Sequence, residues 1–373
     1  MKFAKRAAIA AGAAALGVVV ASGTAQADPP TTTPPTYRTL VGVGSDTTQD
    51  VMNGLANGTG DDQIFDTNPG PDSDGLLIAS YDATPAGTIQ VGAGCSLPRP
   101  DGSGAGVKAL RLDIAANTNC LDFARSSSAP NASGQFTFIP FGVDAVTAAT
   151  ATVTNLPGNY SFKVGGATLP DSEKAQYDLN RVYNCLDTSG NKLADGVYPT
   201  IGGVTVHPLV PQDGSGTRKF WASTLGFDPA HLPSCVKDVA ANGDKVQEHN
   251  GSALQGPNDL MPFSIAQYIA QGRSLPGVTN RRNGAVLATV NGTSTTVTGG
   301  NLNSAFPINR EVYNVVQDSR VTETNIATTF VGSGSDVCSK DFDFANGTSY
   351  VNAYGFGTDP NCGDITLSGK DLI

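Results

Sequence analysis

Short runs rich in Val and Ile alternate along the chain with longer stretches whose apolar residues recur every three or four positions. The first pattern is typical of buried strands and the second of amphipathic helices. One such helix pattern places Phe220, Trp221 and Leu225 on a single face, and Gly226 should end it. The alternation predicts an α/β fold rather than an all-β one. About 345 residues after an N-terminal leader exceed one comfortable core, so two domains are expected.

Four turns between strand-like and helix-like segments are rich in Ser or Thr, and three of them also contain glycine. They read GVGSDTT at 42–48, DGSGAG at 101–106, FARSSSAP at 123–130 and DGSGT at 213–217. A helix start offers unpaired N–H groups and the positive end of the helix dipole, and nearby hydroxyls add neutral donors. Ser and Thr there are also ordinary N-caps, and Thr47 with Asp50 has the spacing of a capping box. Four such turns could nevertheless supply the convergent donors that a dehydrated tetrahedral oxyanion needs.

In this order the four turns resemble those of the phosphate-binding proteins of ABC uptake systems, a family of the periplasmic-binding-protein-like superfamily. Residues 138–146 and 306–313 resemble the two crossover strands of that family, and residues 179–185 resemble a helix of its second lobe. The resemblance covers roughly residues 38–320 and is to a secreted, actinobacterial-type member. It implies an α/β, two-lobe type II fold with two interdomain crossover strands.

The same resemblance implies the domain limits. Lobe one would comprise residues 38–140 plus 309–373, and lobe two residues 141–308. A Pro- and Thr-rich lead-in at 28–37 would precede lobe one, and a Gly-, Thr- and Asn-rich stretch at 291–303 reads as loop or hairpin decoration of lobe two. The ligand would lie in the cleft between the lobes.

The expected ligand is inorganic phosphate or a similar oxyanion, captured for uptake through an ABC transporter membrane component. The residues expected to bind it are Ser45, Asp46, Thr47, Ser103, Gly104, Arg125, Ser126, Ser127, Asp213, Ser215, Gly216, Thr217 and Arg218. No catalytic residue, metal or cofactor is expected.

Two departures from the family pattern concern charge. Typical members carry an Arg two residues before the Asp of the DGSGT turn, where this chain has Pro211. Arg218, Arg125 and Arg99 lie beside the turns and are the candidates to replace it. The family also has an acid in its Ser-containing loop that accepts the proton of hydrogen phosphate. The corresponding stretch here is 126–128, all Ser, so Asp46 is the candidate acceptor.

Two other functions stay open. A binding-protein fold reused as an extracellular interaction module, without anion transport, would fit Pro211. A secreted hydrolase is the less favoured alternative, since Ser103 and Ser215 stand in Gly-flanked turns and His207 is near in sequence. The chain has no G-x-S-x-G elbow, and a Ser without an adjacent base is a poor nucleophile. We therefore expect a binding protein rather than an enzyme.

Residues 1–27 have the pattern of a secretory signal. Lys2, Lys5 and Arg6 precede an apolar run, and residues 25–27 form a small-x-small cleavage site. Removing these three basic residues lowers the formal charge from −10 to −13, which argues against nucleic acid or an anionic membrane as partner. The first cysteine is Cys95, so no lipid-anchor cysteine follows the signal. A secreted monomer, free or held at the cell wall, is expected.

Six cysteines in an exported chain predict three disulfides. Fifteen pairings are possible, and the closures that need least loop folding are Cys95–Cys120 and Cys338–Cys362, with Cys185–Cys235 left over. Each would stabilise the fold by roughly 2–4 kcal/mol. The three histidines are far apart and lack an HExxH spacing, so zinc ligation is not expected.

Overall fold

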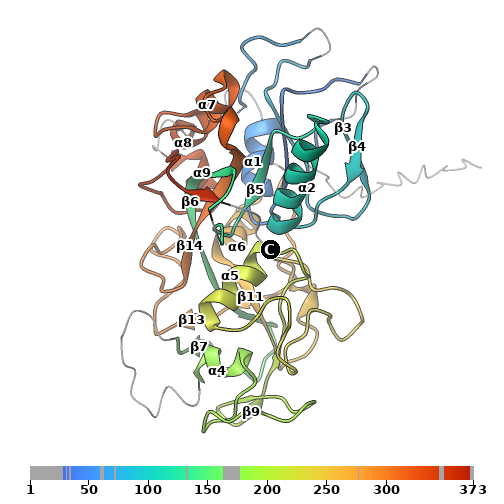
Figure 1. Ribbon diagram of the computed structural model, residues 1–373. Coiled ribbons are helices and arrows are strands. Elements are labelled where there is room, and N and C mark those ends of the chain that lie inside the picture. Colours follow the sequence, from blue (N-terminus) through green and yellow to red (C-terminus); the bar gives the residue numbers. More distant parts are fainter. Residues whose placement is uncertain are drawn as a thin grey trace, which may run out of the picture.

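The computed structural model describes residues 28–369 except 31, 33–34, 59–62, 71–72, 132, 163–176, 276 and 344–347. The predicted signal segment, residues 1–27, lies outside this part. Figure 1 shows two lobes stacked along the long axis, with the blue, teal and red segments above and the green and yellow segments below. The prediction of an α/β fold with two lobes and two crossover strands is confirmed. The exact residue limits of the lobes stay a prediction.

A central mixed sheet has the strand order β10-β11-β6-β14-β5-β1-β2, and β12 and β17 also pair with β6. Its strands and the helices near them are β1 (Leu40–Gly44), α1 (Gln49–Asn57), β2 (Ile78–Ser80), α2 (Ser103–Ala116), β5 (Phe123–Ser126), β6 (Phe136–Thr150), β10 (His207–Pro208), β11 (Asp259–Ser264), β12 (Val286–Leu287), β14 (Asn309–Gln317) and β17 (Ser368–Gly369). The pairs β1–β2 and β1–β5 are parallel, and β14 is antiparallel to both β5 and β6.

Both faces of the parallel part of the sheet are buried. Leu40 of β1 packs with Val51, Met52 and Leu55 of α1 in one apolar cluster. Its sequence neighbour Val41 belongs to a second cluster with the α2 side chains. Successive side chains of a strand point to opposite faces, so a strand covered on both faces is apolar throughout. This explains why the strand that precedes the first glycine turn reads as a continuous Leu-Val-Gly-Val run.

The two long strands β6 and β14 connect the lobes (Figure 1). β14 pairs with the first part of β6, from Gln317 opposite Phe136 to Asn309 opposite Ala145. The last part of β6 pairs instead with β11 and β12, from Val146 to Thr150. One continuous strand therefore belongs to both halves of the molecule, and the turns at the ends of the neighbouring strands meet beside it.

The remaining elements decorate this frame. They are β3 (Thr88–Gly92), β4 (Cys95–Pro98), β7 (Asn159–Tyr160), α4 (Leu179–Tyr183), β8 (Thr200–Ile201), β9 (Val204–Thr205), α5 (Gly216–Leu225), η2 (Gly251–Ala253), α6 (Ile265–Gly272), β13 (Thr289–Val290), η3 (Asp318–Arg320), α7 (Thr324–Phe330), α8 (Asp336–Ser339), β15 (Asp341–Asp343), β16 (Thr348–Ser349) and α9 (Tyr350–Ala353). In the lower lobe Trp221 of α5 packs edge-on against Tyr183 of α4, with ring centroids 5.5 Å apart. Trp221 and Leu225 of the predicted helix face are buried, Phe220 is half-buried, and Gly226 ends the helix at φ 77°.

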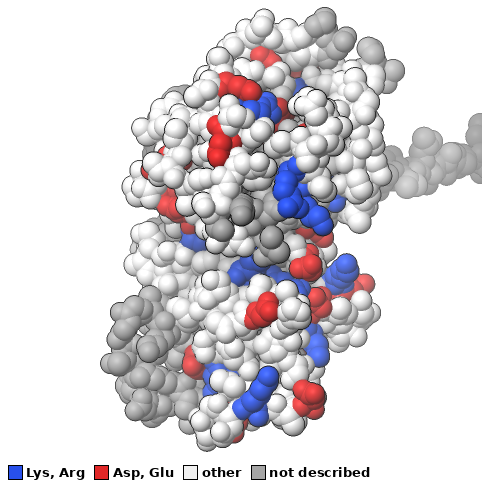
Figure 2. All heavy atoms as spheres, in the orientation of Figure 1, with Lys and Arg blue, Asp and Glu red and all other residues white. Residues whose placement is uncertain are grey.

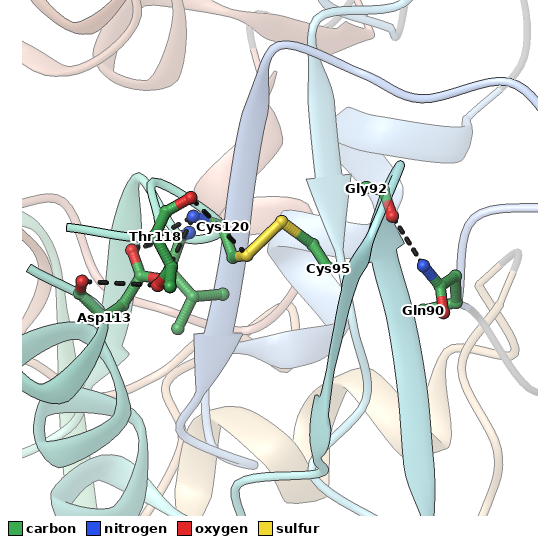
Figure 3. The surroundings of a disulfide bond; sticks show 7 residues. Gln90, Gly92, Cys95, Asp113, Thr118 and Cys120 are labelled. Carbon is green, nitrogen blue, oxygen red and sulfur yellow. Dashed lines mark hydrogen bonds between the residues drawn. A yellow bond between two sulfur atoms is a disulfide. The ribbon is translucent and has the colours of Figure 1, made fainter. Parts of the chain in front are cut away.

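All three predicted disulfides are present: Cys95–Cys120, Cys185–Cys235 and Cys338–Cys362. Figure 3 shows the first, which ties β4 to the loop after α2. Asp113 orders that loop, because its carboxylate accepts from the Cys120 N–H at 3.0 Å and from the Thr118 hydroxyl. Each bridge lies within one lobe, so none of them restrains the movement of one lobe against the other.

Charged residues make up 15% of the chain. On the face seen in Figure 2, Lys and Arg are interspersed with Asp and Glu among many uncharged residues. Within the described residues, no helix combines the length and the apolar character needed to cross a bilayer.

Candidate functional site

The four hydroxyl-rich turns converge at one buried point between the lobes. Thr47 Oγ1 lies 3.1 Å from Ser127 Oγ, and Ser127 Oγ lies 3.2 Å from Ser103 Oγ. Thr217 Oγ1, from the opposite lobe, lies 3.4 Å from Thr47 Oγ1. All four side chains are fully buried. We call Thr47, Ser103, Ser127 and Thr217 the hydroxyl cluster.

The backbone around the cluster brings the lobes into direct contact. The Gly104 N–H donates to the Gly214 carbonyl at 2.9 Å. Gly216, in the first turn of α5, packs so closely on the other lobe that an added Cβ would lie 2.9 Å from Ser103 Cβ and 2.5 Å from Ser127 Oγ. Ser215 is the N-cap of α5, since its hydroxyl accepts from the Arg218 N–H at 3.0 Å. The glycines of the DGSGT turn therefore permit closure, and its Ser holds the helix start.

The capping box expected from Thr47 and Asp50 does not form, and that prediction was wrong. Helix α1 begins at Gln49, its N-cap is Thr48, and no side-chain cap bond is made. The Thr47 hydroxyl points instead into the cluster, where a carboxylate, an imidazole and other hydroxyls compete for it. Tertiary partners of this kind outweigh the modest gain of a helix cap.

The arginines singled out from the sequence make their bonds elsewhere. The Arg125 guanidinium is fully buried and donates to the Ser80 hydroxyl and to the carbonyls of Gly42, Ser45 and Tyr81. Arg218 donates to the carbonyls of Pro211 and Pro229 and pairs with Asp238 at 2.8 Å. Arg99 pairs with Asp28 at 2.7 Å. These side chains fix loops and strands within the lobes rather than facing the hydroxyl cluster.

Arg310 of β14 is the arginine that reaches the cluster. Its Nη2 donates to Thr217 Oγ1 at 2.9 Å and to Asp144 Oδ2 of β6 at 2.9 Å. Its Nη1 has no partner among the described residues, and its guanidinium lies over the Phe220 ring at 5.1 Å. Asp144 is also bound by the Ser264 hydroxyl at 2.7 Å. The crossover strands thus bring a paired cation to the cluster, and the N–H groups of its Nη1 are left to donate.

Glu248 and His249 complete the cluster. Glu248 Oε2 accepts from Thr217 at 2.9 Å, from Thr47 at 3.0 Å and from His249 Nε2 at 3.1 Å. Burial acts to raise the pKa of this carboxyl, but the bond and charge of His249, a hydroxyl bond from Ser215 and the Arg310 charge together lower it to about 2. The carboxylate is therefore ionised at neutral pH. It lies among the hydroxyl donors that we expected, from the sequence, to bind an external anion.

Two acids near the cluster lie at the boundary between the lobes. The Asp46 carboxylate pairs with Arg281 at 3.0 Å, so it holds a cation of the opposite lobe. Asp50 is fully enclosed behind it, and burial together with the Asp46 and Asp82 charges raises its pKa to about 6, against the opposing effect of Arg281. The backbone of the first turn is held as well, because Gln267 Nε2 donates to the Thr47 carbonyl at 2.8 Å.

The other residues expected at the site lie around its edge. The Ser126 hydroxyl donates to the Ser128 carbonyl, and the hydroxyl of buried Ser45 has no partner among the described residues. The Asp213 side chain is exposed. Its neighbour Gln212 donates across the lobes to Asp101 at 2.8 Å. Burial, Asp46 and Glu248 raise the pKa of that acid to about 6, against the amide bonds of Gln247 and Gln212, which lower it.

The residues considered for hydrolysis make other contacts within the described part of the chain. His207 contacts Asp259 at 3.2 Å, and the Ser215 hydroxyl is engaged as a cap. His249 Nε2 contacts a threonine and a glutamate, and its Nδ1 accepts from the Ser264 N–H at 3.3 Å. Among the described residues no group of three or more His, Cys, Asp or Glu side chains could hold a metal ion.

No family model matches the chain, and no curated protein matches it. Solved structures similar to it include a protein assigned as a phosphate ABC transporter substrate-binding protein, with bound phosphate, from Clostridium perfringens: 13% identity, TM-score 0.47, 86% of this chain and 100% of that chain covered. An ABC-type phosphate transport receptor from Vibrio cholerae is 12% identical with a TM-score of 0.46, and the match covers 86% of this chain and 100% of that chain. A mutant of OxyR from Corynebacterium glutamicum is 13% identical with a TM-score of 0.37, and the match covers 78% of this chain and 61% of that chain. TM-scores below 0.5 say nothing about the ligand of this chain.

Proposed function

We propose that this protein is a solute-binding protein whose two lobes close on inorganic phosphate or a related oxyanion, for delivery to an ABC transporter. The observation that carries the proposal is the hydroxyl cluster: donors from both lobes meet at one buried point beside Arg310, whose Nη1 has no partner in the part of the chain that the structure describes. Neutral hydroxyls and one paired arginine suit an anion that must be dehydrated and released again.

Closure is coupled to binding through Thr217. Three hydroxyls of the cluster belong to turns after β1 and β5 and at the start of α2, whereas Thr217 lies on α5 of the other lobe. A ligand shifts a two-state equilibrium only by its differential affinity for the two states. An anion held by both groups of donors would therefore favour the closed form, which a membrane component could recognise.

Isothermal titration of the phosphate-stripped protein with phosphate, and separately with sulfate, at pH 7 tests the proposal. Binding at micromolar or tighter concentration, for phosphate but not sulfate, is the expected result. Heat from neither anion would contradict it.

A second candidate is a binding-protein fold reused as an extracellular interaction module. The observation in its favour is Glu248, whose carboxylate already satisfies donors from both lobes without an external anion. Absence of heat with both anions, together with an unchanged closed shape, is the result that this candidate expects.

A further inference from the structure

Glu248 holds the closed lobes together from within the cluster. Its Oε2 accepts from Thr47 of one lobe and from Thr217 of the other, and neither the acid nor the two threonines has any exposed surface. Its second oxygen, Oε1, has no partner among the described residues. The carboxylate thus makes the bridge between lobes that the proposed function gives to an external oxyanion.

His249 fixes the position of that carboxylate. Nδ1 of its ring accepts from the Ser264 N–H, so in the neutral ring the proton is on Nε2, 3.1 Å from Glu248 Oε2. The His249 backbone has φ 53°, a conformation that is uncommon for a residue with a side chain and that recurs at functional sites. Gln271 Nε2 holds the His249 carbonyl at 3.1 Å. The segment is therefore shaped to bring the acid into the cluster.

The carboxylate and an external anion cannot share these donors. Each threonine hydroxyl has a single proton, and one oxygen of Glu248 lies within hydrogen-bond distance of both hydroxyls, at 3.0 and 2.9 Å. The two hydroxyl oxygens are 3.4 Å apart, and Glu248 Oε2 occupies the position from which one oxygen can accept from both. An anion without a proton to donate would also be repelled by the ionised carboxylate, since like charges in juxtaposition are unfavourable.

We propose that Glu248 is a built-in competitor of the external oxyanion: it occupies the closed site in place of the ligand and must withdraw before an oxyanion binds. The inference rests on the proposed function for the identity of the ligand, but not for the internal bridge itself. It gives the protein a closed form that needs no solute and a ligand affinity lower than its donors alone would provide.

Two variants test the inference. Glu248→Ala removes the carboxylate and leaves a space beside the two threonines, and Glu248→Gln keeps the shape but not the charge. Glu323→Gln, a change at a half-exposed acid on the surface, is the matched control. Each protein, stripped of anions, is titrated at pH 7 with formate, phosphate and sulfate, with melting temperature and heat of binding as readouts.

Formate should raise the melting temperature of Glu248→Ala but not that of the wild type or of Glu323→Gln. Phosphate should bind Glu248→Ala and Glu248→Gln at least about tenfold more tightly than the wild type. If Glu248→Ala does not fold, the phosphate affinity of Glu248→Gln decides. Affinity that is equal or lower in the variants, with no formate effect, would overturn the inference.

The two proposals fail separately. The wild type and the variants could bind phosphate equally, with no effect of formate. The proposed function would then hold, and the role of Glu248 as a competitor would be refuted. If no variant binds phosphate but formate stabilises Glu248→Ala, the internal bridge stands and the proposed function falls.

Discussion

Thr47 and Thr217 donate to the same oxygen of Glu248 although they belong to opposite lobes. Their hydroxyl oxygens are 3.4 Å apart, and Arg310 Nη2 contacts both, at 3.4 and 2.9 Å. The lobes thus meet at this point through hydrogen bonds between side chains. Single substitutions should therefore weaken the contact.

Gly216→Ala should prevent closure. The new Cβ would lie 2.9 Å from Ser103 Cβ, and a backbone-anchored atom cannot rotate away as a hydroxyl can. Residue 216 lies in the first turn of α5, where alanine is well accommodated, so the fold should persist. Small-angle scattering should give a larger radius of gyration than for the wild type. Gly158→Ala, which meets open space, is the control. An unchanged radius in Gly216→Ala would rule out this account of closure.

Thr217→Val should weaken both closure and anion binding. Valine has the shape of threonine but cannot donate to Glu248 or accept from Arg310, and each lost bond to a charged group is worth about 1.5–3 kcal/mol. Phosphate affinity should fall at least about tenfold by titration calorimetry. Thr205→Val, at an exposed strand position, should change nothing. Equal affinities in the two variants would remove Thr217 from the site.

Arg310→Met should destabilise the protein strongly. Asp144 is fully buried and would keep a charge without its cation, a change that typically costs about 3–5 kcal/mol. The double variant Asp144→Asn with Arg310→Met should recover part of that loss in urea unfolding. Arg320→Met, which breaks partly exposed pairs with Asp122 and Glu323, should cost within about 1 kcal/mol. No difference between the two arginine variants would contradict the structural role of the crossover pair.

Asp50→Asn should stabilise the protein at neutral pH but not in acid. The pKa of Asp50 is raised to about 6 from 3.8, so above pH 6 its ionised form disfavours folding, and this penalty disappears as the pH falls towards 4. The variant lacks the charge at every pH. Urea unfolding should therefore show a gain of about 1–3 kcal/mol at pH 7 that vanishes near pH 4. A gain that is constant with pH would refute the titration of Asp50.

Asp46→Asn should leave the choice between phosphate and sulfate unchanged, because the Asp46 carboxylate pairs with Arg281. It should instead weaken the closed form, since that pair joins the lobes. Competition titrations with the two anions measure the first effect, and scattering measures the second. If Asp46→Asn no longer distinguished phosphate from sulfate, Asp46 would be the acceptor of the phosphate proton.

The sequence was informative where structure is local. Three of the four turns could be recognised by glycine beside Ser or Thr, and the fourth by three consecutive Ser residues. Helix α5 could be recognised by its apolar face and Gly226, and the disulfides by short loop closures. Glu248, His249 and Arg310 carry no such signal, because strand pairing and a loop from another part of the chain bring them to the cluster. The arginines were chosen by closeness in sequence, yet long side chains such as Arg125 reach carbonyls on neighbouring strands.

The position of β14 in the sheet has a consequence for the order in which the molecule can be completed. β14 lies between β5 and β6, although β6 ends at Thr150 and β14 begins only at Asn309. Until β14 has been synthesised, β5 and β6 have no partner on their facing edges, whereas the segment between the crossovers is continuous and can form its contacts earlier. Pairing across such a long loop is slow and leaves strand edges open to other chains. The upper lobe should therefore be the last part to become resistant to proteases, and insertion of β14 the step that completes it.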